Sequence, residues 1–163
     1  MRQHEQDHYF MRLALEEASR ATAVGEVPIA AILVHHGDVL VAAHNLRESL
    51  QDPTAHAEII VIRKAAAQRN SWRLTDTTLY VTLEPCPMCA GAIVQSRIAR
   101  LVFGAWDPKA GACGSLFDIP ADRRLNHRVD VIGGILEQES QALLQNFFRP
   151  KRAGTISKFD QRS

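Results

Sequence analysis

The amino-acid sequence predicts a single α/β domain over residues 1–163, built on a mixed five-stranded sheet with helices on both faces. With 163 residues the chain has the length of one domain, and it contains no linker, internal repeat or low-complexity tract. Helix and strand patterns alternate through its second half, which favours parallel pairing under covering helices. A strand hairpin near the start adds antiparallel pairing and makes the sheet mixed.

The first half of the chain predicts a helix, two strands and a second helix. The helix over residues 8–23 is indicated by apolar residues at helical spacing, namely Phe10, Leu13, Ala14, Ala18 and Ala21. In VPIAAILVHHGDVLVAAHN, residues 27–45, two apolar runs flank a tight turn at residues 36–38, which predicts a hairpin. A helix over residues 56–68 then follows a break at residues 52–54.

The second half predicts three further strands and two helices. TLYVTL, residues 78–83, indicates a buried strand, and a short apolar helix follows over residues 87–97. RLVFGA, residues 100–105, indicates another strand, which leads into a loop rich in Gly and Ala over residues 106–116. RVDVIGGI, residues 128–135, is a strand or a strand with a bend. The last helix, over residues 137–149, has an apolar side made of Leu143, Leu144, Phe147 and Phe148.

Charge and hydropathy narrow the classes of function. The net charge of +1 gives no overall attraction to nucleic acid or membrane, so a polyanionic partner has to meet a local patch. No segment of the sequence is apolar over a length sufficient to span a membrane. The N-terminus lacks the apolar segment and cleavage site of a signal peptide. We therefore expect a cytoplasmic protein without a membrane partner.

The C-terminal helix and tail, from about residue 137, are locally basic. The basic residues fall in the stretch 147–163, which has one acid, Asp160, and five cations, namely Arg149, Lys151, Arg152, Lys158 and Arg162. Tail composition alone favours a solvated, frayed terminus. The alternative is a local site for a polyanion.

Cys86 and Cys89 stand three apart in PCPMC, where a helix begins. Positions three apart in a first helical turn point the same way, and the free N–H groups there favour thiolates. The pair is therefore either a redox couple or half of a zinc site. A structural zinc usually needs a second pair of cysteines, whereas Cys113 stands alone in GACGS.

The third ligand is then expected to be a histidine, and His56 is the best candidate because Glu58 follows it at another helix start. Three protein ligands and a water are typical of catalytic zinc. Glu58, not itself a ligand, could accept a proton from the activated water and deliver it to a substrate nitrogen, which is hydrolytic deamination. The alternative is a charged helix cap beside an inert cysteine pair, and the co-occurrence of both motifs disfavours it.

H-x-E followed by P-C-x-x-C is the signature of the zinc nucleobase deaminases. The chain carries it in DPTAHAEI and in TLYVTLEPCPMCAGAIVQSRI, with GEVPIAAILV, VFGAWDPKAGACGSL, NHRV and LLQNFFRPKR around it. Over nearly its full length it resembles the bacterial tRNA-specific adenosine deaminases of the cytidine and deoxycytidylate deaminase superfamily. The resemblance implies a cytidine-deaminase-like three-layer α/β/α fold, Zn²⁺, conversion of wobble adenosine to inosine, an arginine tRNA and a homodimer.

The same resemblance implies roles for individual residues. The zinc ligands are His56, Cys86 and Cys89, with Glu58 as the proton shuttle. Substrate contacts fall on Asn45, Ala57, Leu83 and Glu84. Without the resemblance, Asn45 would be interpreted as a turn residue at the end of a strand. Contacts with the tRNA anticodon stem-loop fall on Asp107, Lys109, Phe147, Phe148, Arg149, Lys151 and Arg152. Helical spacing predicts that one of the two phenylalanines is buried and the other lies nearer the RNA.

Other functions share the same catalytic motifs. A small-molecule purine deaminase such as guanine deaminase has the same core, but a free base needs no basic tail. A riboflavin-type deaminase normally continues into a reductase domain. A catalytically dead zinc fold used as a binding subunit usually lacks the shuttle glutamate, whereas Glu58 is present. Trp106 and Pro108 flank Asp107 unusually for the family; Trp106 either stacks on a base or packs in its loop, and we favour packing.

Overall fold

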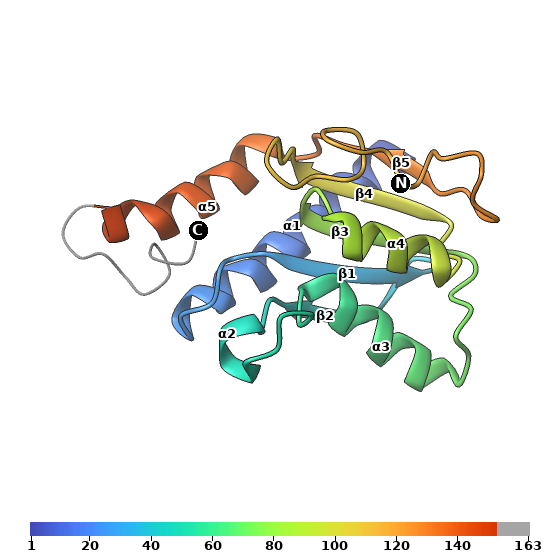
Figure 1. Cartoon of the computed structure of the whole chain (residues 1–163), viewed down its shortest axis with the longest axis horizontal. Helices are drawn as coiled ribbons and strands as arrows, with labels where there is room; N and C mark the ends of the chain where they lie inside the picture. The colour runs from blue at the N-terminus through green and yellow to red at the C-terminus, as the bar shows by residue number, and fades with distance from the viewer. Residues whose placement is uncertain (153–163) are drawn as a thin grey trace.

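The computed structural model describes the backbone of residues 1–152 and the side chains of residues 1–149. Five strands form one sheet in the order β2-β1-β3-β4-β5 (Figure 1). They are β1 (Ala30–His35), β2 (Asp38–His44), β3 (Thr77–Leu83), β4 (Arg100–Ala105) and β5 (Asp130–Ile132). β1 is antiparallel to β2 and β3, whereas β3, β4 and β5 are parallel to one another. The mixed five-stranded sheet predicted from the sequence is confirmed.

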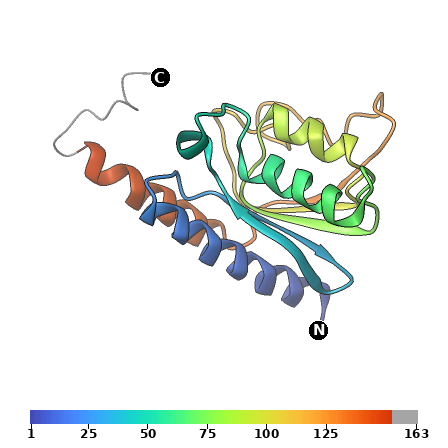
Figure 2. The same cartoon turned by 90° about the horizontal axis from the view of Figure 1, so that it is seen from below.

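Helices cover both faces of the sheet (Figure 2). α1 (Gln3–Ala23) and α5 (Glu137–Arg152) lie on one face, and α3 (Ala57–Arg69) and α4 (Pro87–Gln95) lie on the other. Strand side chains alternate between the two layers, because successive residues of a strand point to opposite faces. Leu79, Val81 and Leu101 join the α3 and α4 cluster, whereas Tyr80 and Val102 join the α1 cluster. The predicted three-layer α/β/α arrangement is therefore confirmed.

α1 begins five residues earlier than the sequence pattern predicted, because a polar side chain in its first turns is held by the sheet. Asp7 is buried, and each of its carboxylate oxygens accepts a 2.6 Å hydrogen bond from the Arg100 guanidinium. The Tyr80 hydroxyl donates a third bond of 2.9 Å to the same carboxylate. Apolar periodicity could not reveal this ion pair, so it placed the helix start at residue 8.

Three other boundaries differ from the prediction. A four-residue helix, α2 (Arg47–Leu50), was not foreseen because one turn shows no periodicity. β5 has three residues instead of the eight predicted, since Gly134 takes a φ of 87° just beyond it. α4 ends at Gln95, two residues early, and Arg97 adopts a φ of 64° in the left-handed region.

α5 approaches the sheet closely at Gly104 of β4. A Cβ added to Gly104 would lie 2.2 Å from Oγ of Ser140, so only glycine permits this contact. Beyond this point α5 also packs on α1, and its last turns extend past the strands (Figures 1 and 2). None of the described helices combines the length and apolar character that a membrane crossing requires.

Candidate metal centre and substrate pocket

Two helix starts meet at one end of the α3 and α4 layer. His56 occupies the N-cap position of α3 and Cys86 that of α4, both with extended backbone. Pro87 follows at the first helical position of α4, where its fixed φ and missing N–H suit a helix start. Because the two helices lie side by side on one face, their first turns bring His56, Cys86 and Cys89 together, as the motif spacing predicted.

The three side chains have the spacing of a tetrahedral zinc site. Nδ1 of His56 lies 3.6 Å from Sγ of Cys86 and 3.5 Å from Sγ of Cys89. Zinc bonds of about 2.05 Å to nitrogen and about 2.3 Å to sulfur, at a tetrahedral angle, separate the two ligand atoms by about 3.6 Å. Among the described residues this is the one group of three His, Cys, Asp or Glu side chains that could hold a metal. Three ligands leave one tetrahedral position open.

Only one of the two cysteine thiols loses its proton readily. A hydrogen bond from Cys89, aided by the nearby His56 ring, lowers the pKa of Cys86 to about 4. The same hydrogen bond and burial raise the pKa of the Cys89 thiol. Two thiolates side by side repel each other, so the second proton leaves only when a cation binds between them. This donor set therefore suits a dication such as Zn²⁺.

Glu58 lies in the first turn of α3, two residues after His56, and its side chain is 4 % exposed. Burial disfavours its charged form and raises the pKa of the carboxyl group. A carboxyl group with a raised pKa binds and releases protons closer to neutral pH, as a general acid and base must. Glu58 faces the same pocket as His56 and Cys86.

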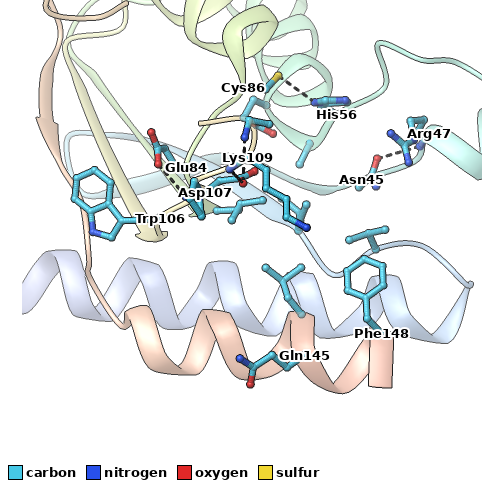
Figure 3. Close-up of a pocket in the computed structure, with 18 residues that line it drawn as sticks. Asn45, Arg47, His56, Glu84, Cys86, Trp106, Asp107, Lys109, Gln145 and Phe148 are labelled. Carbon is cyan, nitrogen blue, oxygen red and sulfur yellow. Dashed lines mark hydrogen bonds between the residues drawn. The ribbon is translucent and has the colours of Figure 1, made fainter. Parts of the chain in front are cut away.

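A pocket of about 580 Å³ opens beside these residues (Figure 3). Most of the predicted site residues line it, namely Asn45, His56, Ala57, Glu58, Leu83, Glu84, Cys86, Asp107, Lys109 and Phe148. Its walls come from the segment around Asn45, from the loop after β4 and from α5. Cys89 is fully buried behind the pocket, and Phe147 and Arg149 are not among the lining residues.

Asn45 directly follows the end of β2 and lines the pocket. It is 7 % exposed, and its Oδ1 accepts a hydrogen bond of 3.1 Å from the backbone N–H of Arg47. This bond leaves the two Nδ2–H donors for a ligand. An amide donor beside the metal centre suits a nucleobase or ribose acceptor.

The loop after β4 forms a second wall, and Glu84 organises it. The buried Glu84 carboxylate accepts backbone hydrogen bonds from Asp107, Cys113 and Ser115, together with the Ser115 hydroxyl. Gly111 packs directly on this carboxylate, since an added Cβ would lie 2.3 Å from its carbon. The Glu84 side chain therefore shapes the wall of the pocket through the loop.

Asp107 and Trp106 are also engaged within this loop. Oδ1 of Asp107 accepts the N–H groups of Lys109 and Ala110, which makes a tight turn facing the pocket. The Trp106 ring packs edge-on against Phe103 at 4.7 Å, and it is still 40 % exposed. The ring therefore packs against β4, as we favoured, and it also lines the pocket.

α5 supplies a third wall through Leu144, Gln145 and Phe148. The prediction that one of Phe147 and Phe148 is buried is wrong, because both are half-buried, with ring centroids 5.1 Å apart. Each keeps partial exposure because the end of α5 extends past the sheet (Figure 2). Arg149 is exposed, and the side chains of Lys151 and Arg152 lie outside the described residues, as does the tail after residue 152.

Sequence reasoning missed several lining residues. Val27 and Ile29 alternate along VPIAAILV, and this period of two could have placed them on one wall. Arg47 and Gln145 gave no signal, because only the fold brings them to the pocket. Cys113 is buried near the carbonyl of Pro85 and stands outside the metal group, which agrees with its exclusion as a ligand.

Comparison with known proteins agrees with this geometry. Residues 4–105 match the model of the cytidine and deoxycytidylate deaminase zinc-binding region. A tRNA-specific adenosine deaminase of Bacillus subtilis is 50% identical over 147 residues, which cover 90% of this chain and 91% of that protein. The chain belongs to the tRNA-specific adenosine deaminase family. Zinc is the metal of the matched region, and the His56, Cys86 and Cys89 group fits it.

Solved structures separate this family from its neighbours. A structure from studies of A-to-I editing by tRNA:A34 deaminases has a TM-score of 0.80 and 48% identity, covering 83% of this chain and 99% of that one. A guanine deaminase from Nitrosomonas europaea has a TM-score of 0.69 and 28% identity, covering 84% and 81%. The fold is shared by both, and the higher identity favours the tRNA branch over guanine deaminase.

Proposed function

We propose that residues 1–163 form a single deaminase domain that converts adenosine to inosine at the wobble position of tRNA in the cytoplasm. The observation that carries the proposal is a tetrahedral His56, Cys86 and Cys89 group beside a buried Glu58, in a chain 50% identical to a tRNA-specific adenosine deaminase. The reaction adds water to the adenine ring and releases ammonia. Water must give up a proton as it bonds to the ring carbon, and the amino nitrogen must gain a proton to leave as ammonia; moving these protons is the task we assign to Glu58.

His56, Cys86 and Cys89 would hold the zinc ion, which when bound supplies Lewis-acid activation of water. The raised pKa of Glu58 suits a group that takes a proton from the attacking water and returns it to the leaving nitrogen. Burial of Glu58 also keeps its carboxyl group away from bulk solvent. The exchange therefore stays between the carboxyl group and the substrate.

The pocket residues would bind and orient the target nucleoside. A volume of about 580 Å³ lies within the range of small-molecule sites and admits one flipped-out nucleoside. Asn45 offers its Nδ2 donors to the base or ribose. Ala57, Leu83 and Glu84 would contribute backbone groups at the base edge, since all three line the pocket.

The anticodon stem-loop would reach this pocket past α5 and the loop after β4. Phe148 offers a half-buried ring on which an unpaired base could stack, and Lys109 adds a cation on the other wall. Arg149, Lys151 and Arg152 would meet the phosphates. We further propose an arginine tRNA with an ACG anticodon as the substrate and a homodimer as the active form.

The substrate class can be tested directly. The purified protein is incubated in parallel with anticodon stem-loops and with free guanine, and the products are hydrolysed for nucleoside analysis. We expect inosine to form in the ACG stem-loop and no measurable loss of guanine. Faster deamination of guanine than of any stem-loop would contradict the tRNA assignment.

The basic end of α5 can be tested by its effect on salt dependence. Replacing Arg149, Lys151 and Arg152 with Gln should weaken stem-loop binding and flatten the plot of log K against log salt, since fewer counterions are released. Zinc content should not change. The matched control removes three exposed cations elsewhere, namely Arg2, Arg12 and Arg128. Equal slopes for both triple variants would show that the α5 cations contact no phosphate.

A further inference from the structure

Glu26 is a buried acid outside the pocket. It lies between α1 and β1, its side chain is fully buried, and its own N–H donates to the carbonyl of Ala21. Its two carboxylate oxygens accept separate backbone hydrogen bonds, from the N–H of Glu48 at 3.2 Å and from that of Ser49 at 2.6 Å. Both donors belong to the first turn of α2. A buried polar side chain is costly unless it is hydrogen-bonded, and these two donors satisfy both oxygens of Glu26.

α2 depends on this distant acid for its cap. The first N–H groups of a helix have no partner inside the helix, and a polar side chain at the N-cap usually accepts them. Leu46 holds the N-cap position of α2 and has no side chain able to accept. Glu26, 22 residues before Glu48 in the chain, supplies the missing acceptor. The placement of α2 therefore rests on a tertiary contact.

The segment that Glu26 holds is a wall of the pocket. Asn45 and Arg47 both line the pocket, and the Asn45 side chain is bonded to the backbone of Arg47, the first residue of the capped turn. The start of this segment has two further backbone bonds, from Asn45 N–H to the Ile29 carbonyl and from Leu46 N–H to the Ala55 carbonyl. Those two contacts would keep the fold in place without Glu26, but neither of them binds the N–H groups of Glu48 and Ser49.

We propose that Glu26 is a positioning residue, which holds residues 45–49 so that Asn45 meets the target nucleotide in one orientation. The inference rests on the proposed function only for the identity of that nucleotide. Glu84 has the same arrangement on the opposite wall, where its carboxylate holds the backbone of residues 107–115. Two buried carboxylates thus hold the two facing walls, and neither needs to touch the substrate.

Hydrogen exchange of the backbone amides tests, without any substrate, whether Glu26 holds this segment. The variants are Glu26→Gln, which keeps one acceptor oxygen, and Glu26→Ala, which keeps none. The control is Asp7→Asn, because Asp7 is equally buried but bonds to Arg100 and Tyr80 under α1. We expect amide hydrogen exchange over residues 45–52 to accelerate at least about tenfold in Glu26→Ala, with a smaller change in Glu26→Gln. Asp7→Asn should leave exchange in this segment unchanged.

Kinetics on the anticodon stem-loop then separate positioning from general stability. We expect Glu26→Gln to lower kcat/KM by about tenfold, mainly through KM, with zinc content unchanged. Asp7→Asn should leave KM unchanged. In a cycle with Asn45→Ala, the double variant should lose scarcely more than Asn45→Ala alone, since Glu26 acts through Asn45.

Two results would overturn the proposal. One is parental exchange over residues 45–52 in both Glu26 variants. The other is full additivity of Glu26→Gln and Asn45→Ala in kcat/KM. Failure of the parent protein to deaminate any stem-loop would instead contradict the proposed function, and the exchange result for Glu26 would stand independently of it.

Discussion

Replacing Glu84 with Gln should loosen one wall of the pocket without removing a metal ligand. In the parent protein, Oε1 accepts the N–H of Asp107 and the Ser115 hydroxyl, and Oε2 accepts the N–H groups of Cys113 and Ser115. An amide has one acceptor oxygen where the carboxylate has two. The NH₂ group must therefore face donors at one of the two positions.

The least costly orientation determines the size of the effect. With NH₂ in the place of Oε1, the Ser115 hydroxyl can rotate and accept, so the N–H of Asp107 alone loses its partner. With NH₂ in the place of Oε2, two backbone N–H groups lose theirs. One unsatisfied buried donor costs about 1–3 kcal/mol, and the remaining bonds weaken because the acceptor is neutral. We expect Glu84→Gln to lower the free energy of unfolding by about 2 kcal/mol.

Urea denaturation measures the stability change, and hydrogen exchange localises it. Exchange should accelerate over residues 107–115 and stay at the parental rate over residues 45–52. Glu16→Gln serves as the control, because Glu16 is exposed on α1 and the change removes the same charge. A loss below about 0.5 kcal/mol, the usual range for surface substitutions, would refute the idea that the Glu84 carboxylate organises this loop.

Three further outcomes can be measured. Burial alone would raise the pKa of Asp7, but hydrogen bonds from Arg100 and Tyr80 outweigh it and hold the pKa below 3.8. The stability that Asp7 contributes is therefore complete above pH 3.8 and is lost as the pH falls through the lower folded value. Asp7→Asn should cost about 3 kcal/mol at pH 7 in urea denaturation, and its deficit relative to the parent should shrink below pH 3.8; a deficit independent of pH would contradict this. Glu58→Gln should lower turnover by about 10²- to 10⁴-fold while metal analysis finds the parental zinc content, and near-parental turnover would exclude the shuttle role. Cys89→Ser should lower bound zinc well below one equivalent, whereas Cys113→Ser should retain it, because the Cys113 side chain lies outside the metal group; zinc loss from Cys113→Ser alone would reverse the assignment.

The metal centre was predictable because its residues are local to two helix starts. Cys86 and Cys89 belong to one helical turn, and His56 and Glu58 belong to another, so short-range geometry sets each pair. Apolar runs likewise predicted the central strands, since a strand buried on both faces of the sheet is apolar at nearly every position. The helix start at Gln3, the one-turn α2 and the half-buried Phe147 and Phe148 gave no such pattern.

The amino-acid sequence by itself determined the helix and strand order, the mixed sheet and the residues able to hold zinc. Only the tertiary structure decided how the pocket is walled, because its walls join segments that are distant along the chain. Glu26 caps a helix that starts at Arg47, Glu84 ties a loop that runs to Ser115, and Phe148 arrives on the last helix. Buried carboxylates need hydrogen-bond donors wherever the fold supplies them, and sequence periodicity carries no record of such long-range pairing.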